Sequence, residues 1–130
     1  MQVPEDLRYT PDHEWLRIDG DEAVIGITEY AASELGDVVF VELPAVGTQL
    51  DAAQSFGVIE SVKTASDLYA PAAGEVIAVN DTLGDKPELV NDDPYGDGWM
   101  VRVRLADPSS TMAGERLMDS DAYRSLVEAG

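Results

Sequence analysis

The sequence predicts a mostly β fold, a small barrel or sandwich with a helix at its C-terminus. Short segments rich in β-branched residues recur about every eight to twelve residues, with Gly, Pro or Asp between them, as in small all-β domains. Apolar residues at helical spacing occupy residues 119–129. With 130 residues, of which 45% are hydrophobic, the chain is long enough for a sizeable core, so we expect one domain over residues 1–130.

The first clear signal is a β hairpin over residues 14–27. Two apolar segments flank Asp19-Gly20-Asp21, and Asp-Gly is a strong hairpin signal because glycine accepts the positive φ of a tight turn. Directly after it, Thr28 can cap a short helix over residues 29–35, which Gly36 would end.

The segment 37–43 is apolar and rich in β-branched residues, which predicts a buried strand that Pro44 ends. After a turn at 45–47 and a short segment at 48–50, further strands are predicted over residues 55–61, 66–70, 75–80 and 99–105. Residues 81–98 are rich in Gly and Pro and predict a loop with one helical turn at 88–90. We expect Trp99, at the end of this loop, to plug the barrel rather than to form a docking surface.

The end of the chain predicts an amphipathic helix over residues 119–129. Its apolar stripe would consist of Met118, Ala122 and Leu126, joined by Tyr123 and Val127. We expect this stripe to pack on the barrel, and a partner helix is the alternative.

Composition excludes several functions. A net charge of −18 repels phosphate backbones and anionic lipids, so we expect neither nucleic-acid nor membrane binding, and any partner should present basic patches. The chain has no cysteine, so sulfur chemistry would have to come from a cofactor. Asp92 and Asp93 could bind a metal ion, but they lack the spacing of a calcium loop. The N-terminus does not resemble a signal peptide, which favours a cytoplasmic protein of bacterial type, although a matured mitochondrial protein would have the same features.

Lys63 is the most informative single residue. The chain has two lysines, Lys63 and Lys86, and Lys63 lies between two strand-like segments, at a turn 62–65 that contains no Gly, Asn or Asp. A lysine at such a tip projects into solvent, where an enzyme can acylate its amine. From the residues alone, an ordinary surface lysine remains the alternative.

Several blocks of the sequence resemble the glycine cleavage system H protein family. In chain order they are Thr10-Pro11-Asp12-His13-Glu14-Trp15, Gly26-Ile27-Thr28-Glu29-Tyr30-Ala31, the segment 35–44, Glu60-Ser61-Val62-Lys63, Tyr69-Ala70-Pro71 with Gly74-Glu75-Val76, and the segment 91–99. Thr64 departs from the alanine that is common after the lysine in this family. Biotinyl domains, with methionines around the lysine, and the lipoyl domains of 2-oxo acid dehydrogenases are less similar.

The resemblance implies a hybrid barrel-sandwich fold and a carrier that is not itself an enzyme. Lipoate would be attached covalently to Lys63. The arm would carry the aminomethyl group of glycine from a pyridoxal-phosphate glycine decarboxylase (P protein) to a folate-dependent aminomethyltransferase (T protein), and dihydrolipoamide dehydrogenase (L protein) would reoxidise it. A lipoate- or octanoyl-transferring enzyme would load the lysine, and we expect the carrier to be a monomer. The alternatives are an H-like protein that relays lipoate to other enzymes and an unmodified interaction module.

Glu14 is the second candidate site residue. We hypothesise that the arm folds into a surface cleft lined partly by Glu14, whose carboxylate could pair with the carried amine. The alternative places His13 and Glu14 at a strand edge in solvent. An acid–base enzyme built on this pair is a poorer hypothesis, because no nucleophile or metal cluster accompanies it.

Overall fold

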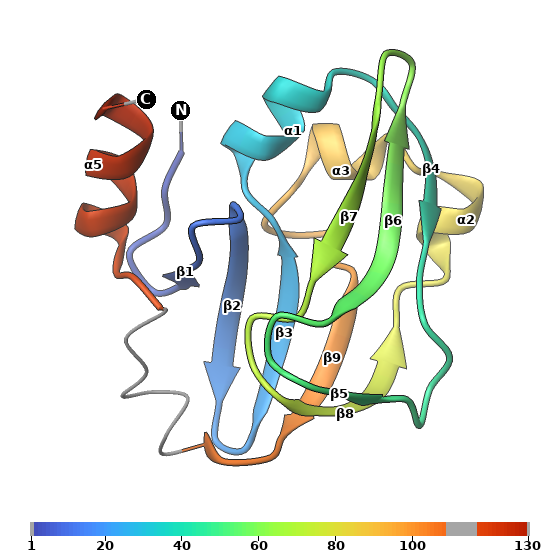
Figure 1. The fold of residues 1–130 in the computed structure, drawn as a ribbon. Helices are drawn as coiled ribbons and strands as arrows, with labels where there is room; N and C mark the ends of the chain where they lie inside the picture. Colours follow the sequence, from blue (N-terminus) through green and yellow to red (C-terminus); the bar gives the residue numbers. More distant parts are fainter. Residues whose placement is uncertain (1, 109–116, 130) are drawn as a thin grey trace.

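The computed structural model describes residues 2–108 and 117–129, and in this part of the chain the strands form two open sheets that face each other (Figure 1). The larger sheet has the strand order β1-β2-β3-β9-β8-β5, and the smaller has the order β4-β6-β7. The strands are β1 (Arg8–Tyr9), β2 (Glu14–Asp19), β3 (Glu22–Ile27), β4 (Val38–Glu42), β5 (Gln49–Leu50), β6 (Ser55–Ser61), β7 (Ala65–Tyr69), β8 (Gly74–Val79) and β9 (Val101–Leu105). The predicted mostly β sandwich is confirmed.

Within residues 2–108 and 117–129, four helices accompany the sheets: α1 (Glu29–Leu35), α2 (Thr82–Asp85), α3 (Leu89–Asp92) and α5 (Ser120–Ala129). The caps predicted for α1 are confirmed, because the Thr28 side chain accepts a hydrogen bond from the Ala31 amide at 3.2 Å and Gly36 ends the helix with φ of 79°. The prediction that residues 81–88 are all loop is wrong, since α2 lies there and buries Leu83.

The core lies between the two sheets, and its side chains alternate along the strands as the sequence predicts. On β9, Val101, Val103 and Leu105 are buried, whereas the intervening Arg102 and Arg104 point outward. Arg102 pairs with Glu22 of β3 at 2.9 Å on that outer face. The core therefore fixes which face of each strand is available to ligands.

The prediction that β4 is a buried strand is wrong for its middle. The register between β4 and β6 shifts between Val38 and Phe40, which is a β-bulge. As a result two consecutive apolar residues face outward, with Val39 53% and Phe40 49% exposed. Only Val38 and Val41 of this strand are buried.

The predicted stripe of the C-terminal helix is confirmed in part, because Tyr123, Met118 and Val127 pack on the rest of the domain, but Ala122 and Leu126 do not. Tyr123 is fully buried and Ser120 nearly so, whereas Ala122 is exposed and Leu126 is 40% exposed. The buried face is centred on Tyr123, whose ring stacks on Tyr9 with centroids 4.7 Å apart. We call the group around it the aromatic cluster; its buried members are Val3, Leu7, Tyr9, Trp15 and Tyr123.

Trp99 does not plug the space between the sheets, so that prediction is wrong. It is half-buried and packs at the margin of the aromatic cluster. The fully buried Met100 beside it belongs to the main core instead. Among the described residues, no helix is long and apolar enough to cross a bilayer.

Candidate functional site

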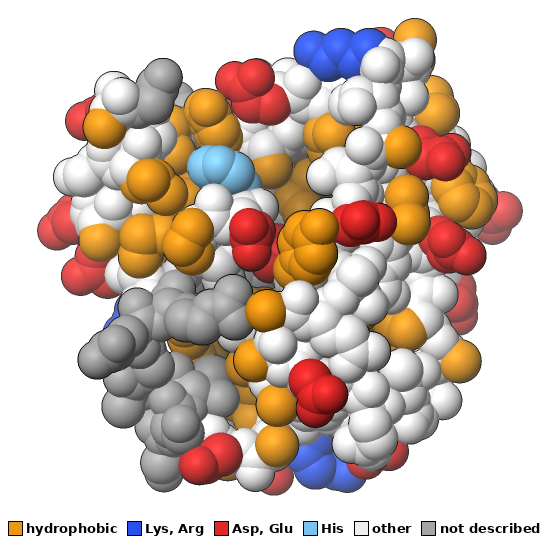
Figure 2. Space-filling view, viewed as in Figure 1, with side chains coloured by type: hydrophobic (Ala, Val, Ile, Leu, Met, Phe, Trp, Pro, Cys, Tyr) orange, Lys and Arg blue, Asp and Glu red, His pale blue; other side chains and the backbone are white. Residues whose placement is uncertain are grey.

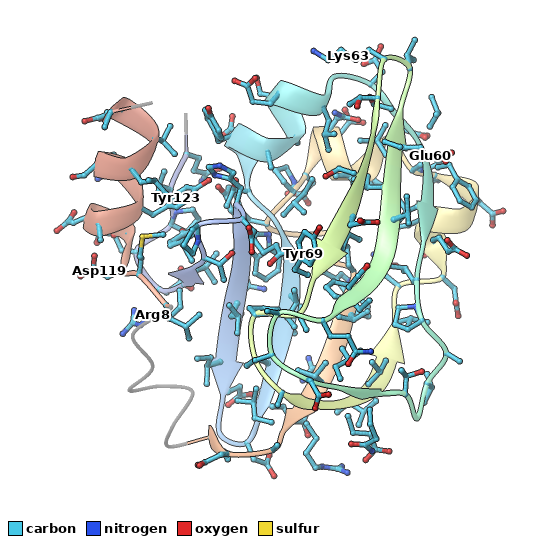
Figure 3. All side chains as sticks on the ribbon, viewed as in Figure 1. Arg8, Glu60, Lys63, Tyr69, Asp119 and Tyr123 are labelled. Atoms are coloured by element: carbon cyan, nitrogen blue, oxygen red, sulfur yellow. The ribbon has the colours of Figure 1, made fainter. Side chains whose placement is uncertain are left out.

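Lys63 lies at the tip of the hairpin formed by β6 and β7, as predicted (Figure 3). The Ser61 amide donates to the Thr64 carbonyl at 2.7 Å, and the Thr64 amide donates to the Ser61 hydroxyl at 3.2 Å. No residue of this turn has a positive φ. The turn therefore does not need Gly, Asn or Asp, because the Ser61 side chain closes it and no residue adopts a left-handed conformation.

The ammonium group of Lys63 stands in solvent. Lys63 is exposed, and no hydrogen bond or ion pair joins its side chain to another residue of the described chain. A Cβ atom built on Gly36 would lie 3.6 Å from the Lys63 Cε atom, so the aliphatic part of the Lys63 side chain lies close to the C-terminal end of α1. The neighbouring Val62 amide donates to the Asp37 carbonyl at 3.1 Å, which ties the hairpin tip to the segment between α1 and β4.

A cleft of about 310 Å³ opens between α1, the start of β2 and strand β7. Its polar lining comprises Asp12, His13, Glu14, Tyr30, Glu34, Ser66 and Asp67. Figure 2 shows the hollow beside the pale blue histidine, with acidic side chains around it. Since β7 leads from the lysine hairpin into the cleft wall, one strand connects the two features.

Glu14 is buried in the wall of this cleft, with only 2% of its surface exposed. One carboxylate oxygen, Oε2, accepts a hydrogen bond from the Tyr69 amide of β7 at 2.7 Å. The other oxygen, Oε1, accepts one from the Thr10 hydroxyl at 3.4 Å. The alternative that placed Glu14 in solvent is therefore wrong.

His13 lines the same cleft and is half-buried. Its backbone has φ of 67°, in the left-handed region that non-glycine residues adopt only when their surroundings hold them there. The ring lies 4.8 Å from that of Tyr30, and Nδ1 lies 2.8 Å from the Tyr123 hydroxyl. Burial lowers the pKa of His13, and the nearby carboxylates of Asp12 and Glu34 oppose this effect.

Tyr123 joins this wall to the C-terminal helix. Its hydroxyl lies 2.7 Å from the Thr28 hydroxyl as well as 2.8 Å from His13 Nδ1. Burial raises the pKa of Tyr123 to about 12, although the hydrogen bond with Thr28 works against the rise. This contact could not be predicted from local patterns, because 95 residues separate Thr28 from Tyr123.

The cleft is suited to a small cation. Four carboxylate residues line it, Asp12, Glu14, Glu34 and Asp67, against one histidine, His13, whose lowered pKa favours the neutral ring. Our reading of the sequence missed Glu34, although its spacing from Tyr30 places both on one face of α1. Among the described residues, no cluster of His, Asp and Glu could hold a metal ion.

A solvent-exposed lysine on a β hairpin, beside a cleft lined by carboxylates, is the arrangement expected of a carrier domain that presents a group attached to its lysine. The family model described as "Glycine cleavage H-protein" matches residues 7–130. A "Probable glycine cleavage system H protein" of Haloarcula marismortui is 57% identical over 128 residues, covering 98% of each chain. The "Glycine cleavage system H protein" of Nitratidesulfovibrio vulgaris is 58% identical over 127 residues, covering 98% of this chain and 96% of that one.

Solved structures agree with this assignment. The crystal structure of a glycine cleavage system H protein from Mycobacterium marinum superposes with a TM-score of 0.88 at 39% identity, covering 97% of this chain and 99% of the other. The chain belongs to the glycine cleavage H-protein family. It is thus a lipoyl carrier of the glycine cleavage system, a carrier subunit rather than a catalyst.

Proposed function

We propose that lipoate is attached to Lys63 through an amide and that the resulting arm works over the acidic cleft. The observation that carries the proposal is the position of Lys63, exposed at a hairpin tip whose strand β7 forms one wall of the cleft. The ammonium group has no partner among the described residues, so acylation breaks no contact seen in the structure. The attached dithiolane would supply the sulfur chemistry that a chain without cysteine lacks.

The cleft lies within reach of such an arm. Each strand residue adds ~3.3 Å, so Ser66 to Leu68, which line the cleft, begin ~10 Å from the lysine backbone. A lysine side chain extended by an acyl chain covers that distance. We infer that the carried amine enters the cleft, where Glu14 accepts a charge-assisted hydrogen bond from it while keeping its bond to the Tyr69 amide.

The proposed partners are the enzymes that would load, use and reoxidise the lipoyl group. We propose that the carrier meets, in turn, a glycine decarboxylase, an aminomethyltransferase and dihydrolipoamide dehydrogenase, and that a lipoate- or octanoyl-transferring enzyme loads it. Catalysis belongs to those partners and their cofactors, whereas the tether raises the local concentration of the reacting sulfur. We also infer a cytoplasmic location, which the bacterial origin of several relatives supports.

Attachment is tested by intact-mass analysis of the protein from lipoate-replete cells. We expect a lipoyl increment on the wild-type protein and on Lys86→Arg, and none on Lys63→Arg, which keeps the positive charge but cannot be acylated in the same way. A lipoyl increment on Lys63→Arg would assign the modification to another residue.

The proposed role of Glu14 in protecting the carried amine from water is tested by the rate at which the loaded arm releases that amine. Glu14→Gln keeps an acceptor for the Tyr69 amide but removes the charge, so we expect release to accelerate about tenfold or more. Glu42→Gln is the matched control, because Glu42 is exposed on β4 and does not line the cleft. Equal rates in wild type and Glu14→Gln would remove Glu14 from this role.

A further inference from the structure

Three large apolar side chains are exposed beside Lys63. Val62 is 77% exposed, Val39 is 53% exposed and Phe40 is 49% exposed. We call these three residues the hairpin patch. Figure 2 shows hydrophobic side chains along the edge of the molecule that carries β4 and β6, below the blue lysine at the top.

The sheet register brings the patch together. Phe40 lies opposite Glu60 of β6, which is three residues before the lysine, and the Val62 amide donates to the Asp37 carbonyl just before β4. The bulge between Val38 and Phe40 turns both Val39 and Phe40 outward. Regular alternation would have sent one of them into the core, so the bulge creates this surface.

Such a surface is unusual for the place it occupies. Strand β4 is at the edge of its sheet, where exposed apolar side chains invite association and proteins usually place charged residues. With a net charge of −18, the chain is rich in acidic residues, yet none of them occupies these three positions. Apolar residues gathered at one edge beside the lysine therefore indicate a surface that a partner covers.

The short length of the unmodified lysine side chain indicates which partner covers this surface. Before the arm exists, the only reactive atom is the lysine Nζ, which extends only about 6 Å from its Cα. An enzyme that acylates this atom must therefore bring its active site onto the hairpin tip and touch the exposed neighbours of Lys63. Enzymes that act on the finished arm meet its sulfur atoms an acyl chain further away, so they can work without contact with this tip.

We propose that the hairpin patch is the docking surface for the enzyme that transfers the acyl group to Lys63, and that it has no part in the later steps. The proposal rests on lipoylation of Lys63 as set out above. Val62 and Phe40 would bury their side chains against an apolar surface of that enzyme, while the neighbouring Lys63 enters its active site.

The test compares two reactions of the same variants. Phe40→Ser and Val62→Ser are combined, and the initial rate of acylation of apo protein by a purified lipoate-transferring enzyme is measured. We expect kcat/KM to fall about tenfold or more, since two apolar side chains are lost from the contact. Val46→Ser is the matched control, because Val46 is 60% exposed in the turn between β4 and β5, away from the patch, and we expect no change there.

The second reaction separates docking from later steps. The double variant is acylated to completion with excess enzyme, and the rate at which dihydrolipoamide dehydrogenase turns over its arm is compared with wild type. We expect rates equal within about twofold. Unchanged acylation of the double variant, or an equal loss in both reactions, would overturn the proposal, whereas failure to modify wild-type Lys63 would overturn the attachment site itself. Unchanged thermal unfolding of the double variant excludes misfolding as the cause.

Discussion

The lysine hairpin leads into one wall of the cleft, and the aromatic cluster lies behind another wall, where Tyr123 contacts His13. The two regions are built in opposite ways. Every residue from Val62 to Asp67 is exposed, and the turn is held by bonds between Ser61 and Thr64. In the aromatic cluster every member is at most 5% exposed, and Tyr123 bonds to side chains from two other parts of the chain. The difference shows that buried packing is concentrated behind His13, whereas the hairpin that carries Lys63 stays exposed to solvent.

The largest difference in unfolding free energy is expected when an apolar side chain is truncated in each of the two regions. Trp15 is fully buried, and its indole donates to the Pro94 carbonyl at 3.0 Å, so we expect Trp15→Ala to lower the free energy of unfolding by about 3–5 kcal/mol. Val62→Ala should change it by less than about 0.5 kcal/mol. Urea denaturation of both variants measures the contrast, and similar losses would contradict it.

A single hydroxyl group tests the next largest effect. Tyr123→Phe keeps the stacked ring but removes the hydrogen bonds to Thr28 and His13, so we expect a loss of about 1–3 kcal/mol of unfolding free energy. Tyr69→Phe, on strand β7, is the control. Tyr69 is 37% exposed, so its substitution should leave the free energy of unfolding almost unchanged. An equal effect of the two variants in urea denaturation would show that the Tyr123 hydroxyl contributes no special stability.

Alkaline pH should weaken the aromatic cluster selectively. Burial raises the pKa of both Tyr9 and Tyr123, the latter from 10.0 to about 12, so the folded state holds protons that the unfolded state releases. This contribution to stability is complete below pH 10 and is lost as the pH rises toward 12. Urea unfolding measured at several alkaline pH values should show a shallower decline for Tyr123→Phe than for wild type, and parallel declines would contradict the assignment.

The smallest effect is expected on the acid side, from His13. Because burial lowers its pKa, the unfolded state binds the proton first, and stability falls as the pH drops below the ordinary value of 6.5. His13→Asn tolerates the left-handed backbone and carries no titrating ring, so its stability should fall less steeply over that range. Histidine ring shifts measured by NMR against pH check the direction of the pKa change independently.

Local chemistry made much of the fold predictable from sequence. The Asp-Gly turn before β3, with φ of 64° at Gly20, and the caps of α1 at Thr28 and Gly36 all depend on backbone preferences of one or two residues. The alternation around Arg102 on β9 depends only on strand geometry. The position of Lys63 at a hairpin tip followed from the strand-like segments on either side of it.

The errors and omissions come from contacts between distant segments. A bulge shifts the pairing of two strands and is invisible in the apolar run of β4, so the exposure of Phe40 could not be foreseen. In the predicted stripe of helix α5, Ala122 and Leu126 are exposed because the stacking of Tyr123 on Tyr9 centres the buried face on Tyr123. Burial of Glu14 depends on β7, which lies 55 residues further along the chain at Tyr69.

The bond between Glu14 and the Tyr69 amide has a consequence for how the protein can be observed. Strand β7 is at the edge of its sheet, so this side chain takes the place of a neighbouring strand for one backbone amide. If a carried amine forms a hydrogen bond with the Glu14 carboxylate, as proposed, it would change the strength of the hydrogen bond from the Tyr69 amide. The deuterium exchange rate and the NMR shift of the Tyr69 amide would therefore report whether the carrier is empty or loaded, without any added label.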